Sequence, residues 1–140
     1  MTDKKTIKDT ELIAAATQAR ELAHAPYSRF PVGAAVLTAS GRVFAGVNVE
    51  NASYGLSVCA ERVAIWKAVT EGETEIVAVA VVTTSGVSPC GACRQVMAEF
   101  ASGVKGLAGV RVLVADLSGR CVEYTLDDLL PAAFTPANLD

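Results

Sequence analysis

The positions of three cysteines constrain this chain more than any other feature. Cys59 is followed two residues later by Glu61, and Pro89 introduces Cys90 and Cys93. Three thiolates can hold one zinc ion per subunit and leave the fourth tetrahedral position open, which separates a catalytic zinc from a closed structural one. Glu61 lies close to a ligand without being required as one. The sequence therefore predicts a fold that brings two distant segments together around one Zn²⁺.

Apolar periodicity predicts alternating helices and strands. Helices are expected over 10–25, 58–70 and 90–102, with a short last helix opened by a cap at 125–128 and stopped by Pro131. Strands are expected over 32–37, 43–49, 75–83, 110–115 and 120–124. This order implies an α/β fold, a three-layer α/β/α arrangement around a mixed five-stranded sheet. Residues 1–140 are interpreted as one catalytic domain, with residues 1–9 frayed.

The expected helices place all three sulfurs near helix N-termini. Cys59 falls at the start of helix 58–70, and Cys90 and Cys93 share one face of the first turn of helix 90–102. The partial positive charge at a helix N-terminus lowers cysteine pKa and favours the thiolates that zinc requires. Three thiolates around Zn²⁺ leave a net negative charge. Arg62 is expected to offset it by donating hydrogen bonds to a thiolate, and Arg94 is a second candidate.

Two other interpretations of the cysteines stay open at this point. A closed structural zinc site would need a fourth ligand, and Cys121 and His24 are the remaining candidates. Cys121 is expected to be a small core residue of a strand, and His24 a surface or capping residue near the end of the first helix. A redox pair at Cys90 and Cys93 would leave the spacing of Cys59 and Glu61 unexplained.

Composition narrows the class of partner. The net charge is −3, and no run of Lys and Arg marks a nucleic-acid surface, so a small-molecule substrate is favoured. Apolar residues make up 51% of the chain, which indicates either a homo-oligomer or a well-filled core. No segment has the pattern of a signal peptide or a membrane span. We expect a cytoplasmic protein whose cysteines bind metal rather than form disulfides.

The cysteine spacing also carries a resemblance. In its three-cysteine form it matches the signature of zinc nucleobase deaminases. Beyond it, the chain resembles the small homotetrameric cytidine deaminases of pyrimidine salvage. Five motifs in the family's order carry this likeness over nearly the whole chain, at residues 27–35, 48–54, 59–62, 88–95 and 129–134. Gly55 departs from the pattern, because many relatives carry proline there.

The resemblance implies substrate contacts that the residues alone do not. It implies that Asn48 and Glu50 hydrogen-bond the ribose hydroxyls, that Phe30 forms a wall beside the pyrimidine, and that Ala60 contacts the base through its backbone. Further contacts across a subunit interface are implied for Ala52, Tyr54 and Phe134. Without the resemblance, Phe30 is expected in the core and the Asn48 and Glu50 pair on a solvated strand edge.

The implied activity is the zinc-dependent hydrolysis of cytidine and 2′-deoxycytidine to uridine and 2′-deoxyuridine plus ammonia. Zinc supplies an activated water for attack at C4 of the ring. Glu61 is then expected to be the proton shuttle, with its pKa raised by a closed apolar pocket. Three alternatives are weighed: deamination of a polynucleotide, deamination of another small aminopyrimidine, and a zinc-stabilised module without enzymatic activity.

Overall fold

A five-stranded mixed sheet forms the middle of the molecule. The computed structural model describes residues 2–139, with side chains from residue 8 onward. The strands are β1 (Gly33–Thr38), β2 (Val43–Val47), β3 (Ile76–Val82), β4 (Arg111–Ala115) and β5 (Cys121–Thr125). They are arranged in the order β2-β1-β3-β4-β5, and only the central β3–β4 pair is parallel. The mixed sheet expected from the sequence is confirmed.

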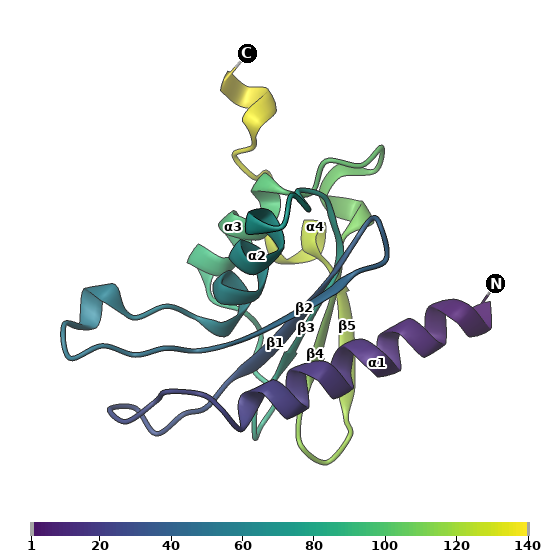
Figure 1. The fold of residues 1–140 in the computed structure, drawn as a ribbon. Helices are drawn as coiled ribbons and strands as arrows, with labels where there is room; N and C mark the ends of the chain where they lie inside the picture. The colour runs from purple at the N-terminus through teal and green to yellow at the C-terminus, as the bar shows by residue number, and fades with distance from the viewer. Residues whose placement is uncertain (1, 140) are drawn as a thin grey trace.

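Helices cover both faces of this sheet (Figure 1). The longer helices are α1 (Thr2–Arg20), α2 (Ala60–Thr70) and α3 (Gly91–Glu99), and α4 (Leu126–Leu129) is a single turn. One face carries α1, and the opposite face carries α2, α3 and α4. Short 3₁₀ turns also lie in the connecting segments at Tyr54–Leu56 and Gly106–Gly109 and near the C-terminus at Pro136–Leu139. This is the three-layer arrangement that the element order predicts.

The central strand β3 is buried on both sides because each side faces a helix layer. Ala78 and Ala80 point toward α1, whereas Val79 and Val81 point toward α2 and α3. A strand buried on both faces is a near-continuous apolar run, as this one is. The small side chains on the α1 side let that helix approach closely.

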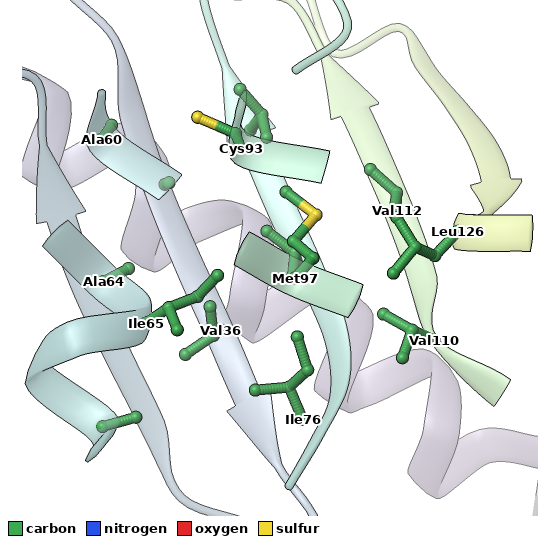
Figure 2. Packing of buried hydrophobic residues seen from close by; sticks show 14 of the residues in the cluster. Val36, Ala60, Ala64, Ile65, Ile76, Cys93, Met97, Val110, Val112 and Leu126 are labelled. Carbon is green, nitrogen blue, oxygen red and sulfur yellow. The ribbon is translucent and has the colours of Figure 1, made fainter. Parts of the chain in front are cut away.

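The larger core lies between the sheet and the layer of α2 and α3 (Figure 2). Ile65 of α2 and Met97 of α3 are fully buried there. Cys93 lies one helical turn before Met97 and belongs to the same cluster. The core therefore fixes the rotation of α3, and with it the direction of one candidate metal ligand.

The first helix differs from its expected bounds at both ends. It begins at Thr2 rather than Thr10, so the segment expected to be frayed is helical apart from Met1, which lies outside the described residues. It ends at Arg20 because the chain then leaves the helix axis to pair with another segment. The His24 N–H donates to Asn48 O at 3.0 Å, and His24 O accepts from Glu50 N at 2.8 Å. His24 is therefore an exposed loop residue rather than a helical one.

Smaller differences affect the other elements. The β2 strand ends at Val47 rather than 49, and α3 ends at Glu99 rather than 102. The expectation that Cys121 is a core residue is wrong. It is exposed because β5 is an edge strand whose first three residues face solvent. Within the described residues, no helix combines the length and the apolar character needed to cross a membrane.

Candidate metal centre and adjoining cavity

The three cysteines of the sequence prediction meet at the N-termini of α2 and α3. Cys59 is the N-cap of α2, Cys90 is the N-cap of α3, and Cys93 lies in the first turn of α3. The Cys59 and Cys90 Sγ atoms are 3.8 Å apart, those of Cys90 and Cys93 are 3.4 Å apart, and all three lie within 4.8 Å of one another.

This spacing fits zinc. Tetrahedral Zn–S bonds of about 2.3 Å place the sulfurs about 3.8 Å from one another. Among the described residues, no fourth side chain of a metal-binding type joins the cluster, so it leaves one coordination position for a non-protein ligand. Neither His24 nor Cys121 belongs to the cluster, and this geometry argues against a closed structural site.

The surroundings favour the thiolate form of Cys59, whereas the hydrogen bond with Cys59, followed by burial, raises the pKa of Cys93. The Arg62 Nη2 atom donates to Cys59 Sγ at 3.4 Å. The hydrogen bond with Cys93, and to a lesser degree Arg62, lowers the pKa of Cys59 to about 5. The guanidinium of Arg62 therefore provides positive charge beside the cluster, which offsets part of the excess negative charge of three thiolates.

Arg94 does not donate to a sulfur as the sequence analysis expected. Its Nε donates to Pro89 O at 2.7 Å, its Nη1 to Leu129 O at 2.8 Å and its Nη2 to Ser88 Oγ at 3.1 Å. Arg94 thus holds the segment that enters α3 against the end of α4. Arg94 therefore influences the position of Cys90 through the backbone of the segment that precedes it, rather than through a hydrogen bond to its sulfur.

Glu61 is a buried carboxyl beside the metal cluster. It is the second residue of α2 and only 4% exposed. Burial raises its pKa to about 7, with a smaller contribution from Cys59. Glu61 stays outside the group of sulfurs that could share one ion, yet it lines the same cavity. A carboxyl so placed can exchange protons with a ligand near neutral pH.

A cavity of about 310 Å³ opens in front of the cysteines. This volume lies at the lower end of the range for small-molecule sites. Two groups of residues form much of its lining. One group comes from the metal cluster and the start of α2 and α3, namely Cys59, Ala60, Glu61 and Cys90, and the other comes from the segments at 28–32 and 48–50, namely Ser28, Phe30, Val32, Asn48 and Glu50. Among the residues that the structure describes, no Lys or Arg lines the cavity.

Asn48 uses its side chain to brace the wall that carries Phe30. Its Oδ1 accepts from Val32 N at 2.9 Å, and its Nδ2 donates to Phe30 O at 2.9 Å. One Nδ2 hydrogen and one Oδ1 lone pair are left after these bonds. Asn48 is 9% exposed and lines the cavity. Asn48 can therefore hold the wall and still contact a ligand.

Glu50 is fixed by the turn that precedes Phe30. Its Oε1 accepts from Tyr27 N at 3.0 Å and from Ser28 N at 3.1 Å, and its Oε2 accepts from the Ser28 hydroxyl. The hydrogen bonds from Ser28, led by its hydroxyl, lower the pKa of Glu50, so this carboxyl is ionised at neutral pH. The part of the cavity lining formed by residues 28–32 and 48–50 thus offers a fixed negative charge.

Sequence reasoning missed two residues of this site. Ser28 bridges Glu50 and Phe30, because its Oγ also accepts from Phe30 N at 3.0 Å. Thr83 is fully buried, and its Oγ1 accepts from Gly86 N at 2.8 Å and from Val87 N at 3.1 Å, which holds the loop before Pro89. The motif at 27–35 contains Ser28, but neither residue type signals such a role by itself.

The residues expected at an interface do not line this cavity. Tyr54 is 74% exposed and its ring packs edge-on against Tyr27, with centroids 5.8 Å apart. Phe134 is 58% exposed, and its carbonyl accepts from Gln95 Nε2 at 2.7 Å. Ala52 is exposed in the loop before Tyr54. Ala60, in contrast, is buried and lines the cavity beside Cys59.

Comparison with known proteins agrees with this geometry. Residues 6–106 match the family described as the cytidine and deoxycytidylate deaminase zinc-binding region. The chain belongs to this deaminase family. Membership, together with the three-cysteine cluster, identifies zinc as the cofactor and the chain as an enzyme of the hydrolase class.

Individual deaminases of the family are similar over most of the chain. A cytidine deaminase of Halalkalibacterium halodurans is 52% identical over 131 residues, which cover 92% of this chain and 96% of the relative. The crystal structure of a Burkholderia pseudomallei cytidine deaminase is 47% identical and superposes with a TM-score of 0.82, covering 89% of this chain and 98% of that one. A Mycobacterium tuberculosis cytidine deaminase is 40% identical in sequence. Its crystal structure superposes with a TM-score of 0.75 and covers 89% of this chain and 95% of its own. The deaminase fold is therefore confirmed.

Proposed function

We propose that this enzyme hydrolyses free cytidine and 2′-deoxycytidine to uridine and 2′-deoxyuridine plus ammonia, as a cytoplasmic step of pyrimidine salvage. The observation that carries the proposal is the buried Glu61 beside the cluster of Cys59, Cys90 and Cys93, at one side of a nucleoside-sized cavity. Cytidine deaminases that align with this chain over nearly their whole length support the same reaction.

The three cysteines would hold zinc, which when bound activates a water molecule for attack on C4 of the cytosine ring. Glu61 lines the cavity beside the cluster, where it can accept the proton of the attacking water and deliver it to ring N3. It then passes a proton to the departing amine, so that water is consumed and ammonia leaves. Burial of Glu61 keeps bulk water from competing for these protons.

Other residues of the cavity lining would hold the rest of the nucleoside. Phe30 and Val32 offer apolar surface to the flat base, and Ala60 lies beside the metal cluster where its backbone can contact the ring. Asn48 and Glu50 have hydrogen-bonding capacity left for sugar hydroxyls. A carboxylate and an amide together can both accept from and donate to a ribose.

Charge favours a nucleoside over a nucleotide. Within the described part of the chain, no cationic side chain of the lining could pair with a phosphate, and Glu50 adds negative charge to the cavity. The same balance argues against an oligonucleotide, whose backbone needs Lys and Arg contacts. We therefore expect cytidine to be deaminated and cytidine 5′-monophosphate and oligonucleotides to be poor substrates.

Assembly into a homotetramer is a further part of the proposal. Large apolar side chains are exposed, among them Leu22 at 82%, Leu56 at 67% and Phe134 at 58%. Such residues are expected at subunit interfaces rather than in contact with water. Ala52, Tyr54 and Phe134, which do not line their own cavity, would then reach the cavity of a neighbouring subunit. Light scattering after size exclusion should give four times the mass of one chain.

The deciding experiment follows the loss of cytosine absorbance on cytidine, with zinc per chain measured in the same sample. Glu61→Gln should retain zinc and the fold but lose at least about 100-fold in turnover. The substrate panel adds cytidine 5′-monophosphate, a short single-stranded oligonucleotide and another aminopyrimidine. A zinc-loaded protein that releases no ammonia from cytidine would refute the proposal, and Glu61→Gln with normal turnover would refute the role of Glu61.

A further inference from the structure

We propose that Ser28 is a positioning residue that aligns the Glu50 carboxylate with the sugar of the substrate; this rests on the proposed deamination of nucleosides. The Ser28 hydroxyl joins two other residues that line the cavity, Glu50 and Phe30. It donates to Glu50 Oε2 and accepts from Phe30 N at 3.0 Å. One side-chain oxygen thus links the carboxylate to the segment that carries the aromatic wall.

The turn around Ser28 is held in an uncommon conformation. Arg29 has a φ of 56°, in the left-handed region that residues with side chains rarely occupy. Its N–H donates to Ala25 O at 2.9 Å. The bonds from Tyr27 N and Ser28 N to Glu50 lie just before this residue, and the bond from Phe30 N to Ser28 Oγ lies just after it. Such conformations persist where the surroundings over-determine them, as these bonds do.

Glu50 depends on this turn for its direction. The Glu50 carboxylate accepts three hydrogen bonds from residues 27 and 28. Two come from the backbone N–H groups of these residues and one comes from the Ser28 hydroxyl. The two N–H bonds share Oε1, so the Ser28 hydroxyl is what fixes Oε2. Removing the hydroxyl leaves one oxygen held and the carboxylate plane free to rotate about it. A mobile carboxylate binds sugar hydroxyls more weakly, since ordering it again costs entropy.

The test compares two substrates in Ser28→Ala. With cytidine, kcat/KM should fall about tenfold, mainly through a higher KM, because a hydrogen bond to a charged group is lost. With 2′,3′-dideoxycytidine, which keeps the 5′-hydroxyl but lacks the 2′- and 3′-hydroxyls that Glu50 is proposed to contact, the loss should be no more than about threefold. Ser28→Thr keeps the hydroxyl and should recover most of the cytidine activity.

Ser118→Ala is the matched control. Ser118 Oγ also donates to a carboxylate, Asp116 Oδ1 at 2.7 Å, in the β4–β5 turn outside the cavity. Ser118→Ala should leave kcat/KM unchanged for both substrates. Zinc content and thermal midpoint identify a variant that has lost its fold. If Ser28→Ala loses its fold, Ser28→Cys replaces it in the comparison of the two substrates, because a thiol is only a weak hydrogen-bond donor.

The outcomes separate this inference from the proposed function. Equal losses on the two substrates would overturn the coupling through Glu50, and so would full activity of Ser28→Ala on cytidine. A zinc-loaded wild type with no activity on cytidine would instead overturn the deamination itself. Loss confined to the substrate with 2′- and 3′-hydroxyls, and recovered by Ser28→Thr, supports the assignment.

Discussion

Gly46 is a point of close approach between the sheet and the helix that carries Glu61. A Cβ atom added at Gly46 of β2 would lie 2.5 Å from Ala64 N and 2.9 Å from Ala60 O, both backbone atoms of α2. Backbone cannot rotate away as a side chain can. To restore ordinary contact, α2 must move by roughly 0.5 to 1 Å, and its first turn carries Ala60 and Glu61.

Two opposing effects decide the outcome of Gly46→Ala. Loss of glycine entropy in the unfolded chain stabilises by about 0.4–1 kcal/mol, whereas overpacking costs about 1–3 kcal/mol. The second is larger here because the clash is with backbone, so the thermal midpoint should fall by several degrees. A displacement near 1 Å at the reacting groups costs about 100-fold, and we expect kcat on cytidine to fall between tenfold and that limit.

The assay measures kcat, zinc per chain and thermal midpoint for Gly46→Ala beside Gly55→Ala. At Gly55 an added Cβ meets nothing within 4 Å, so this control should behave as wild type. Gly46→Ala should lose turnover while remaining folded. Wild-type turnover together with an unchanged thermal midpoint would show that α2 does not depend on this contact for the placement of Glu61.

Four further predictions follow from single features of the structure. Cys90→Ala, or treatment with a strong chelator, should remove zinc and activity together and lower the thermal midpoint, as metal analysis and calorimetry would show. Leu12→Ala removes a fully buried side chain of α1 that packs against the sheet, and it should cost about 2–5 kcal/mol in denaturant unfolding. Arg111→Met removes paired hydrogen bonds to two carboxylates and should cost about 1–3 kcal/mol, with a smaller loss at high salt. Hydrogen bonds from Ser28 lower the pKa of Glu50 and so stabilise the fold while Glu50 is ionised. Ser28→Ala should therefore lower the free energy of unfolding at neutral pH, and its difference from wild type should shrink as the pH falls below about 4.5. Denaturant unfolding measured at several pH values would test this.

Most of the fold follows from local patterns in the sequence. The near-continuous apolar run at β3 predicted a strand covered on both faces, and the structure places helices on both sides. The end of the first helix could not be predicted, because it depends on the pairing of His24 with residues 48 and 50, far along the chain. Cys121 shows the same limit, since its exposure follows from the position of β5 at the sheet edge.

The site divides in a similar way. The spacing of Cys59, Cys90 and Cys93 alone predicted that three sulfurs would meet, because ligand number and helix position leave few other arrangements. Side-chain partners were less predictable. Arg94 lies directly after a cysteine, yet it donates to carbonyl groups and a serine hydroxyl. Ser28 was missed because its partners are set by the folded turn, which no local pattern indicates.

The cysteines that begin α2 and α3 stand where a serine or aspartate would ordinarily satisfy the first free N–H groups of a helix. Neither Cys59 nor Cys90 makes such a capping bond, so the first N–H groups of both helices have no cap from these side chains. A bound cation would tie the two helix starts together through sulfurs that lie 3.8 Å apart, and its release would remove that link. Amide exchange in the first turns of both helices should accelerate together on chelation, which makes local order at these two ends a gauge of metal content.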